Sequence, residues 1–266
     1  MAHAQESSNL ILVSTPLPGI RVCTLNRPTK RNALSQDLIN QLLLQLKLAS
    51  EDQDICSVII TGSGSFFSAG ADIKEISQID AEDAQQIRYL EDLCDGVRNV
   101  RKPVIVAVEG KALGGGFELA LMADFIVATP AVEFGLPEVT IGLIPGAGGT
   151  QRLTSAVGKY RAMKMILLNE PLSGTEAGNL GLVSLLTDPG NALQGALDLA
   201  TKLGSRSPSA IRSAKEAICR ADELGQDELF ERSLYYMALG TKDKAEGVAA
   251  FLEKRTPVWN SPKQSP

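Results

Sequence analysis

Histidine is almost absent from this chain of 266 residues. The only histidine is His3, close to the start of the sequence, where chains are usually poorly ordered. This shortage argues against a Ser-His-Asp triad, a Cys-His dyad and a metal site with several histidine ligands. Acid–base chemistry in this chain has to rely on carboxylates, lysine, tyrosine or backbone amides.

Cysteine is scarce and unpatterned, and long apolar runs are missing. No Cys-x-x-Cys pair occurs, and each cysteine sits in an apolar or helical stretch: Cys23, Cys56, Cys94 and Cys219. We expect reduced, buried thiols, as in a cytosol-like compartment. No run of 18 apolar residues exists, so we expect no transmembrane span and no membrane partner.

Targeting signals are not recognisable in the given sequence. The first ten residues, MAHAQESSNL, contain no apolar signal-peptide core and no arginine-rich amphipathic pattern. The last residues, SPKQSP, lack a peroxisomal SKL address. We therefore expect a cytoplasmic protein, with the mitochondrial matrix as the alternative if the source is eukaryotic.

The glycine motifs that hold nucleotide phosphates are also missing. No GxxxxGK[ST] sequence is present, and two near matches to GxGxxG place Phe67 and Gln151 where the third glycine belongs. Lys and Arg number 26 against 31 Asp and Glu, which gives 26 − 31 = −5. We therefore expect no ATP, no nicotinamide cofactor and no nucleic-acid partner held by bulk charge.

The apolar pattern predicts an α/β fold. Hydrophobic residues make up 44% of the chain, enough for a large core. Helices are predicted after an N-cap at Ser35, over Ala81–Arg98 and over Phe117–Ala123. They alternate with short β-branched runs, which favours parallel strands. The predicted strands are Leu10–Val13, Ile20–Leu25, Ser57–Thr61, Pro103–Val108 and Phe125–Ala128.

The character of the chain changes after about Leu199. Helical stretches are predicted from Ser207-Pro208 onwards, over Leu224–Leu239 and over Lys244–Leu252. We therefore expect two parts. Residues 1–199 form a core that carries the active site, and residues 200–266 form a helical region for packing or oligomerisation.

Two strand-to-glycine passages could form an anion site. The strand ending at Val108 runs into Gly114-Gly115-Gly116 and then into the helix that carries Glu118. Unpaired amides at a helix start stabilise negative charge, and glycines allow close approach. The segment Ser68–Asp72 could supply a second amide. The alternative is purely structural: the glycines allow tight packing and Glu118 caps its helix.

A second glutamate, Glu138, lies in an apolar segment. It follows Phe134-Gly135-Leu136-Pro137 and precedes the glycine-rich stretch Ile144–Leu153. A poorly solvated carboxyl group there could stay protonated at working pH and act as an acid. The alternative is an ordinary glutamate on a surface loop.

These segments together resemble the crotonase superfamily, and most closely its enoyl-CoA hydratases. The matching stretches are SAGADIKE, ALGGGFELALMAD and PEVTIGLIPGAGGTQRL, at residues 68–75, 112–124 and 137–153. The resemblance spans nearly the whole chain. It implies an α/β fold of the crotonase (ClpP-like) type, a spiral of ββα repeats with a C-terminal helical region.

The resemblance also implies a role for individual residues. Glu118 and Glu138 would be catalytic, Ala71 and Gly115 would donate the two oxyanion-hole amides, and Gly146 would help to hold the catalytic water. The coenzyme A thioester would be lined by Ala69, Asp72, Ile73 and Lys74. Phe251 and Lys254 would reach the coenzyme A of a neighbouring subunit in a homotrimer or homohexamer.

One position departs from the family pattern. Many members carry a lysine directly after Arg-Pro for a coenzyme A phosphate, whereas this chain has Thr29 there. The contact would then shift to Lys30 or Arg31. No cofactor beyond the coenzyme A of the substrate is implied, and no metal.

The implied reaction is reversible syn addition of water to a trans-2-enoyl-CoA, giving a 3-hydroxyacyl-CoA. An isomerase of the same superfamily is the alternative, but it generally lacks one of the two glutamates. RNA-binding relatives carry a lysine-rich first helix, whereas Lys47 is the only lysine of residues 35–54 here. The acyl chain length and the pathway stay open.

Overall fold

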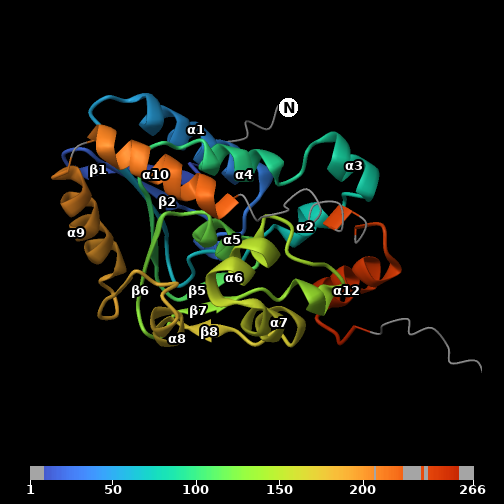
Figure 1. Cartoon of the computed structure of the whole chain (residues 1–266). Coiled ribbons are helices and arrows are strands. Elements are labelled where there is room, and N and C mark those ends of the chain that lie inside the picture. The colour runs from blue at the N-terminus through green and yellow to red at the C-terminus, as the bar shows by residue number, and fades with distance from the viewer. Residues whose placement is uncertain (1–8, 207, 224–234, 237–238, 258–266) are drawn as a thin grey trace, which may run out of the picture.

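A computed structural model describes residues 9–206, 208–223, 235–236 and 239–257. His3 lies outside this part of the chain. The described residues form a six-stranded sheet in the order β1-β2-β3-β4-β6-β9 and a smaller sheet in the order β5-β7-β8. The pair β1 and β2 is antiparallel, and the other pairs of the large sheet are parallel. The α/β prediction is thus confirmed (Figure 1).

The predicted strands all occur, and four short ones were not predicted. Pro16 lies inside β1, which the sequence pattern ended at Val13. Proline is tolerated there because β1 is the outer strand of the sheet. The strands are β1 Ile11–Leu17, β2 Ile20–Leu25, β3 Ser57–Gly62, β4 Val104–Val108, β5 Lys111–Leu113, β6 Phe125–Ala128, β7 Glu133–Gly135, β8 Leu172–Ser173 and β9 Leu185–Leu186.

Helices begin close to the predicted caps. Ser35 accepts a hydrogen bond from the Leu38 amide and starts α1 (Gln36–Glu51). The prediction of one helix over Ala81–Arg98 is wrong, because the chain splits into α3 (Ala81–Gln86) and α4 (Glu91–Arg98). Arg88 and Leu90 between them have φ of 52° and 69°, which no α-helix accommodates.

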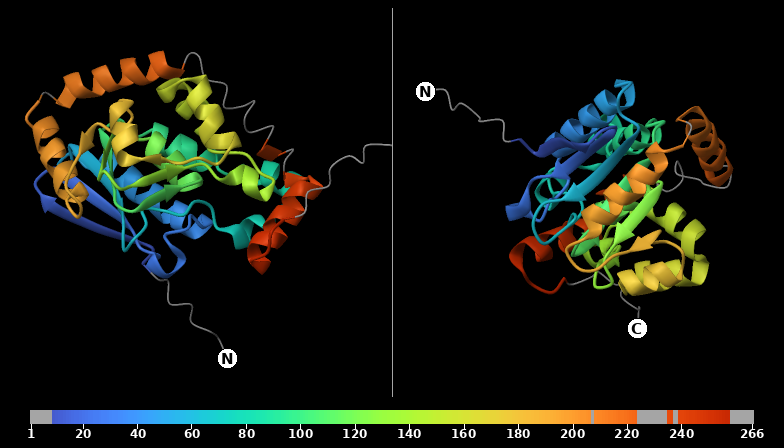
Figure 2. Two further views of the ribbon diagram at one scale, coloured as in Figure 1. Left: turned by 90° about the horizontal axis from the view of Figure 1, so that it is seen from below. Right: turned by 90° about the vertical axis from the view of Figure 1, so that its left-hand side faces the viewer.

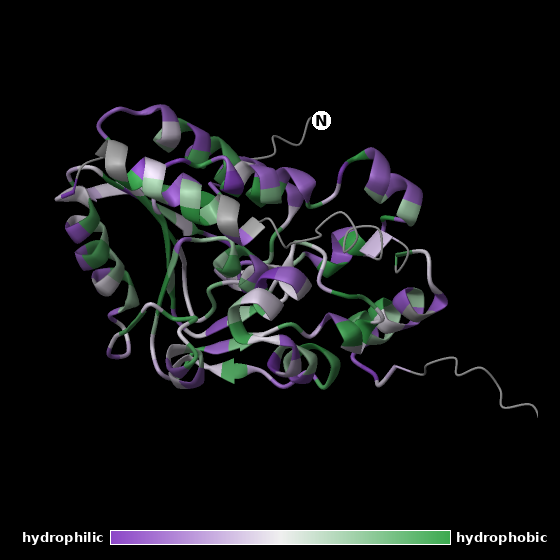
Figure 3. Cartoon of the chain, viewed as in Figure 1, coloured by the Kyte–Doolittle hydropathy of each residue, from purple (hydrophilic) through white to green (hydrophobic). Residues whose placement is uncertain are grey.

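Helices cover both faces of the large sheet. Alternate residues of β3 face opposite sides. Val58 and Ile60 pack with the core that includes α1 and α4, while Ile59 packs with the small residues of α9 (Ala192–Gly204). Both faces are therefore apolar, as is usual for parallel strands. Figure 2 shows α9 on the opposite side of the sheet from α1, and Figure 3 shows apolar residues concentrated between the layers.

The other helical elements before α9 are short, with three to nine residues each. They are η1 (Pro28–Lys30), α2 (Ile73–Ile76), α5 (Gly115–Leu121), η2 (Glu138–Ile141), α6 (Gly149–Val157), α7 (Lys159–Leu167) and α8 (Gly174–Asn179). Helix α5 begins at Gly115, two residues before the predicted start. Gly115 and Gly116 already belong to the first helical turn, and Gly114 is the N-cap.

The C-terminal part contains α10 (Pro208–Glu223) and α12 (Lys242–Glu253). Most of the predicted helix Leu224–Leu239 lies outside the described residues. Helix α9 runs through the expected boundary after residue 199, so the division into two parts stays a prediction. Helix α12 packs on η2, where the Gly247 backbone lies directly against Ile141.

Within the described part of the chain, no helix has both the length and the apolar character that crossing a bilayer requires.

Candidate active site

Two glycine-containing turns, one at Gly70 and one at Gly114–Gly115, lie against each other. The place where they meet is called the corner below. Short parallel bridges pair Leu34 with Ala71 and Ser68 with Ala112. These bridges bring the turn at Gly70 beside the start of α5. A Cβ built on Gly70, whose φ is +94°, would lie 3.1 Å from the Gly115 nitrogen. No side chain fits between the two turns, so the glycines there permit the close approach.

The predicted oxyanion amides therefore lie together. A Cβ built on Gly115 would lie 3.5 Å from the Ala71 nitrogen. Gly115 is the first residue of α5, where amides have no partner within the helix. The bridge at Ala71 is closed by Leu34 donating to Gly70 and by Asp72 donating to Leu34, so the bridge does not use the Ala71 N–H. Two amides so arranged can bind a developing oxyanion.

Glu118 is held by the start of the next helix. Its side chain is 2% exposed, and its Oε1 accepts 2.8 Å hydrogen bonds from the amides of Ala147 and Gly149. Gly149 is the first residue of α6, so the carboxylate also lies at the positive end of that helix. Both features stabilise a negative charge on Glu118.

Glu138 lies on the other side of the same corner. The pairing of β5 with β7 sets Leu113 beside Gly135, so the chain reaches Glu138 just as it passes Gly114. A Cβ built on Gly114 would lie 3.1 Å from Glu138 Oε1, and one built on Gly115 would lie 3.9 Å from Glu118 Oε2. Both predicted catalytic carboxylates therefore border the predicted oxyanion amides.

Aromatic residues that the sequence motifs did not include form one wall. The ring of Tyr235 lies against Gly146, where an added Cβ would be 2.6 Å from Cδ2. Tyr235 stacks on Tyr89 with ring centroids 6.2 Å apart. Burial, followed by the charges of neighbours that include both glutamates, raises the pKa of Tyr235 well above 10. Its hydroxyl group therefore stays neutral at physiological pH.

The segment from Ala69 to Lys74 contains Ala71 and continues into the first residues of α2. Asp72 accepts 3.1 Å hydrogen bonds from both terminal nitrogens of Arg27 and caps α2 through the Lys74 amide. Arg27 was not among the predicted site residues. Ala69 and Ile73 are half-buried, and Lys74 is exposed. The Asp72 carboxylate is thus engaged in holding the loop.

The two candidate phosphate ligands near the N-terminus are both exposed. Lys30 ends η1, and Arg31 has a φ of 52° with its guanidinium carbon 5.3 Å from the centroid of the Phe66 ring. Phe251 and Lys254 are exposed at the end of α12, on a different element. Their predicted contact with a neighbouring subunit stays a prediction.

Metal-binding residues do not cluster in the residues that the structure describes. Groups of three or more His, Cys, Asp or Glu side chains that could hold an ion are absent from that part. Of the acidic residues near the corner, Glu118 is bonded to two amides and Asp72 is bonded to Arg27.

Comparison with known proteins identifies the family. The family model described as enoyl-CoA hydratase/isomerase matches residues 17–263. The chain belongs to the enoyl-CoA hydratase/isomerase family. It is 45% identical to the probable mitochondrial enoyl-CoA hydratase of Dictyostelium discoideum, covering 91% of this chain and 88% of that protein.

Two further members of the enoyl-CoA hydratase/isomerase family extend the comparison. The 2,3-dehydroadipyl-CoA hydratase of Escherichia coli is 43% identical over 90% of this chain and 94% of its own. The crystal structure of the enoyl-CoA hydratase of Bacillus anthracis has a TM-score of 0.76 at 37% identity, covering 94% and 98% of the two chains. The crotonase-type fold expected from the sequence is confirmed by these family relatives.

Proposed function

We propose that this chain is an enoyl-CoA hydratase, which adds water reversibly and with syn geometry to a trans-2-enoyl-CoA. The observation that carries the proposal is the convergence of two carboxylates, Glu118 and Glu138, on the corner formed by the Gly115 and Ala71 amides. Several family relatives are named as hydratases of CoA thioesters. A second carboxylate also favours hydration over isomerisation, which needs to move only one proton.

In the proposed mechanism, the Ala71 and Gly115 amides hold the thioester oxygen. Glu118, whose charge is stabilised by two amides, removes a proton from water while the water oxygen bonds to the β-carbon. The π electrons move to the thioester oxygen and form an enolate. The enolate then collapses as Glu138 delivers a proton to the α-carbon. Removal of one oxyanion donor typically costs about 3–4 kcal/mol.

The remaining parts of the proposal concern binding. The backbone of Gly146 would help to position the water. Coenzyme A would run along Ala69, Asp72, Ile73 and Lys74, with its phosphates near Lys30 or Arg31. We propose no metal or cofactor beyond the coenzyme A of the substrate. Activity that survives exhaustive chelation would support this point, and activity that depends on added Zn²⁺ or NAD would contradict it.

We further propose a homotrimer or homohexamer in which residues 200–266 pack between subunits. Phe251 and Lys254 would then contact the coenzyme A of a neighbour. Light scattering of the purified protein tests this assembly, and an active, stable monomer would overturn it. The cytoplasm is the proposed location, with the mitochondrial matrix as alternative. Subcellular fractionation of the source cells decides between them.

The deciding experiment is a spectrophotometric screen of 2-enoyl-CoA thioesters of increasing chain length. Loss of the conjugated enoyl-thioester absorbance, with a 3-hydroxyacyl-CoA identified by mass spectrometry, is the expected result. Formation of a 3-enoyl-CoA without uptake of water would instead support the isomerase alternative. A protein that transforms none of these thioesters would refute both.

A further inference from the structure

The turn at Ala147–Gly149, whose amides donate to Glu118, has further hydrogen-bond partners of its own. The Ala147 carbonyl accepts a 2.7 Å hydrogen bond from Arg152 Nη1, and Cys94 Sγ lies 3.6 Å from the same oxygen. The N–H of the same residue donates to Glu118. Ala147 is therefore hydrogen-bonded at both its amide and its carbonyl. The amide donates to Glu118 of α5, and the carbonyl accepts from Arg152 of α6.

The glycine at position 148 makes this arrangement possible. Gly148 has a φ of +93°, and a Cβ built on it would overlap Nη1 of Arg152. The guanidinium group thus folds back over the first turn of its own helix, α6, and occupies the space that a side chain would take. The guanidinium group therefore packs on the same turn whose Ala147 and Gly149 amides donate to Glu118.

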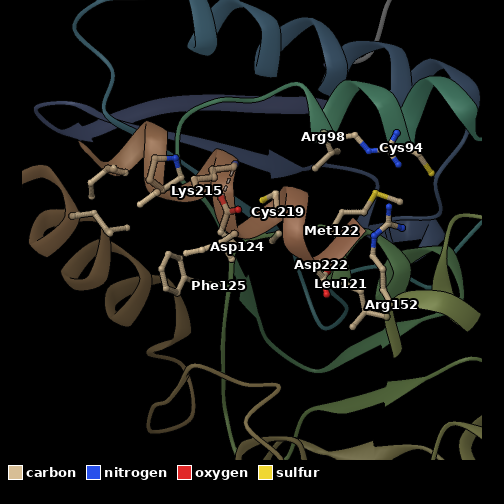
Figure 4. A pocket seen from close by; sticks show the side chains of 17 residues that line it. Cys94, Arg98, Leu121, Met122, Asp124, Phe125, Arg152, Lys215, Cys219 and Asp222 are labelled. Atoms are coloured by element: carbon tan, nitrogen blue, oxygen red, sulfur yellow. Dashed lines mark hydrogen bonds and ion pairs between the residues drawn. The ribbon is translucent and has the colours of Figure 1, made fainter. Parts of the chain in front are cut away.

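Arg152 bonds the turn at a carbonyl, whereas Glu118 bonds it at two amides. Together with Cys94, Arg152 lines a cavity of about 580 Å³ between α4, the end of α5 and α10 (Figure 4). Neither Glu118 nor Glu138 is among the described residues that line this cavity. Ala147 lies between the two groups, because its carbonyl accepts from Arg152 and its N–H donates to Glu118.

We propose that Arg152 is a positioning residue for the Glu118 carboxylate. By fixing the Ala147 carbonyl, it keeps two N–H groups aimed at Glu118 Oε1 and so stabilises the ionised form that takes a proton from water. The proposal rests on the proposed function for the role of Glu118. Its structural part, the effect of Arg152 on the charge of Glu118, can be measured without catalysis.

Other titratable groups also face Glu118. They are Glu138 of η2, Tyr89 from the link between α3 and α4, and Tyr235. Burial is the main cause that raises the pKa of both tyrosines above the usual value for tyrosine, so they do not titrate between pH 5 and 9. Changes in that range therefore do not come from these two tyrosines.

The test compares Arg152→Gln, Arg152→Lys and the wild-type chain. Without the guanidinium group the turn loses its anchor, so kcat for crotonyl-CoA should fall about 10- to 100-fold while KM changes little. The acidic limb of the kcat profile should move to higher pH, because the ionised Glu118 has lost support. Lysine keeps the positive charge and can still donate a hydrogen bond. For Arg152→Lys, kcat and the position of the acidic limb should therefore lie between those of Arg152→Gln and the wild type.

A matched control is Arg161→Gln on α7, since Arg161 is exposed. It should leave kcat and the pH profile unchanged. Misfolding of Arg152→Gln is recognised by circular dichroism, and it would lower the active fraction without moving the pH limb. A folded Arg152→Gln variant with the wild-type limb and wild-type kcat would overturn the proposal.

A second measurement separates this proposal from the proposed function. In protein labelled with ¹⁵N-alanine and ¹⁵N-glycine, the amide signals of Ala147 and Gly149 should follow the titration of the carboxylate to which they donate. The midpoint should move to higher pH in Arg152→Gln and not in Arg161→Gln. An unchanged midpoint refutes the role of Arg152. A moved midpoint in a chain that hydrates no enoyl-CoA refutes only the proposed function.

Discussion

Gly115 and Ala71 face each other so closely that a Cβ on the first would lie 3.5 Å from the nitrogen of the second. This pair is the proposed binding site for the thioester oxygen, and it depends on backbone N–H groups alone. Gly115 is the first residue of α5, a position at which helices accept proline. Proline there would remove the N–H and leave the helix itself allowed.

We therefore predict that Gly115→Pro lowers kcat for crotonyl-CoA by about 10²–10³-fold, the usual cost of one oxyanion donor. Steady-state kinetics with circular dichroism measures this. Lys242→Pro, at the exposed first position of α12, is the matched control and should retain activity. A folded Gly115→Pro enzyme with near-normal turnover would remove Gly115 from the oxyanion site.

Glu118→Gln and Glu138→Gln should each lower kcat by about 10²–10⁴-fold, because glutamine keeps the size of the side chain but exchanges no proton. Thioester binding, followed by calorimetry with a non-reactive acyl-CoA, should change little. The double variant should be only slightly worse than the poorer single variant, because groups that act as a unit are non-additive. A single variant with wild-type hydration would show that its residue is not catalytic.

Asn32 should be important for stability rather than for chemistry. Its side chain is fully buried, donates to the carbonyls of Ser63 and Phe66, and accepts from the Arg27 amide. Asn32→Ala leaves these groups without their partner, so the free energy of unfolding should fall by about 2–4 kcal/mol. Urea denaturation measures the change. Asn40→Ala, on the exposed face of α1, should change it by less than about 0.5 kcal/mol.

Alkaline pH should destabilise the protein partly through Tyr235. The pKa of this buried hydroxyl is raised in the folded chain, whereas an unfolded tyrosine titrates near about 10. The contribution of the protonated Tyr235 hydroxyl to the free energy of unfolding is therefore complete below about pH 10, and it is lost as the pH rises further. The free energy of unfolding of Tyr235→Phe should fall less steeply between pH 9 and 11 than that of the wild type. Tyr160→Phe, at a tyrosine that is 89% exposed, should follow the wild type. Equal slopes for Tyr235→Phe and the wild type would contradict the effect.

Much of the fold could be predicted because local signals agreed with one another. β2 and β6 have the predicted bounds, and α1 starts at the predicted cap. The break between α3 and α4 could not be predicted, since Arg88 and Leu90 are ordinary helix formers and their positive φ values follow from packing. The strands β8 and β9 have two residues each, too few for a periodic pattern.

The candidate site, too, was predictable only in part. Its four central residues lie within or next to the glycine-rich segments of the sequence: Ala71, Gly115, Glu118 and Glu138. Tyr89 and Tyr235 belong to no such segment and meet only through the fold. Arg152 lay inside a recognised segment, but its contact with the Ala147 carbonyl depends on the conformation of Gly148. Sequence spacing carries no information about such a contact.

The glycines around the active-site corner also bear on how this enzyme could be diversified. At Gly62, Gly70 and Gly116 an added methyl group would meet neighbouring backbone atoms within 2.8 Å, so random libraries should return almost only inactive clones there. The partly buried side chains of Ile73, Ile141 and Ile144, by contrast, pack in the cluster that contains Tyr89 and Tyr235. New substrate ranges are therefore best sought by recombining side chains in this apolar cluster. In such variants Gly62, Gly70 and Gly116 would be kept unchanged.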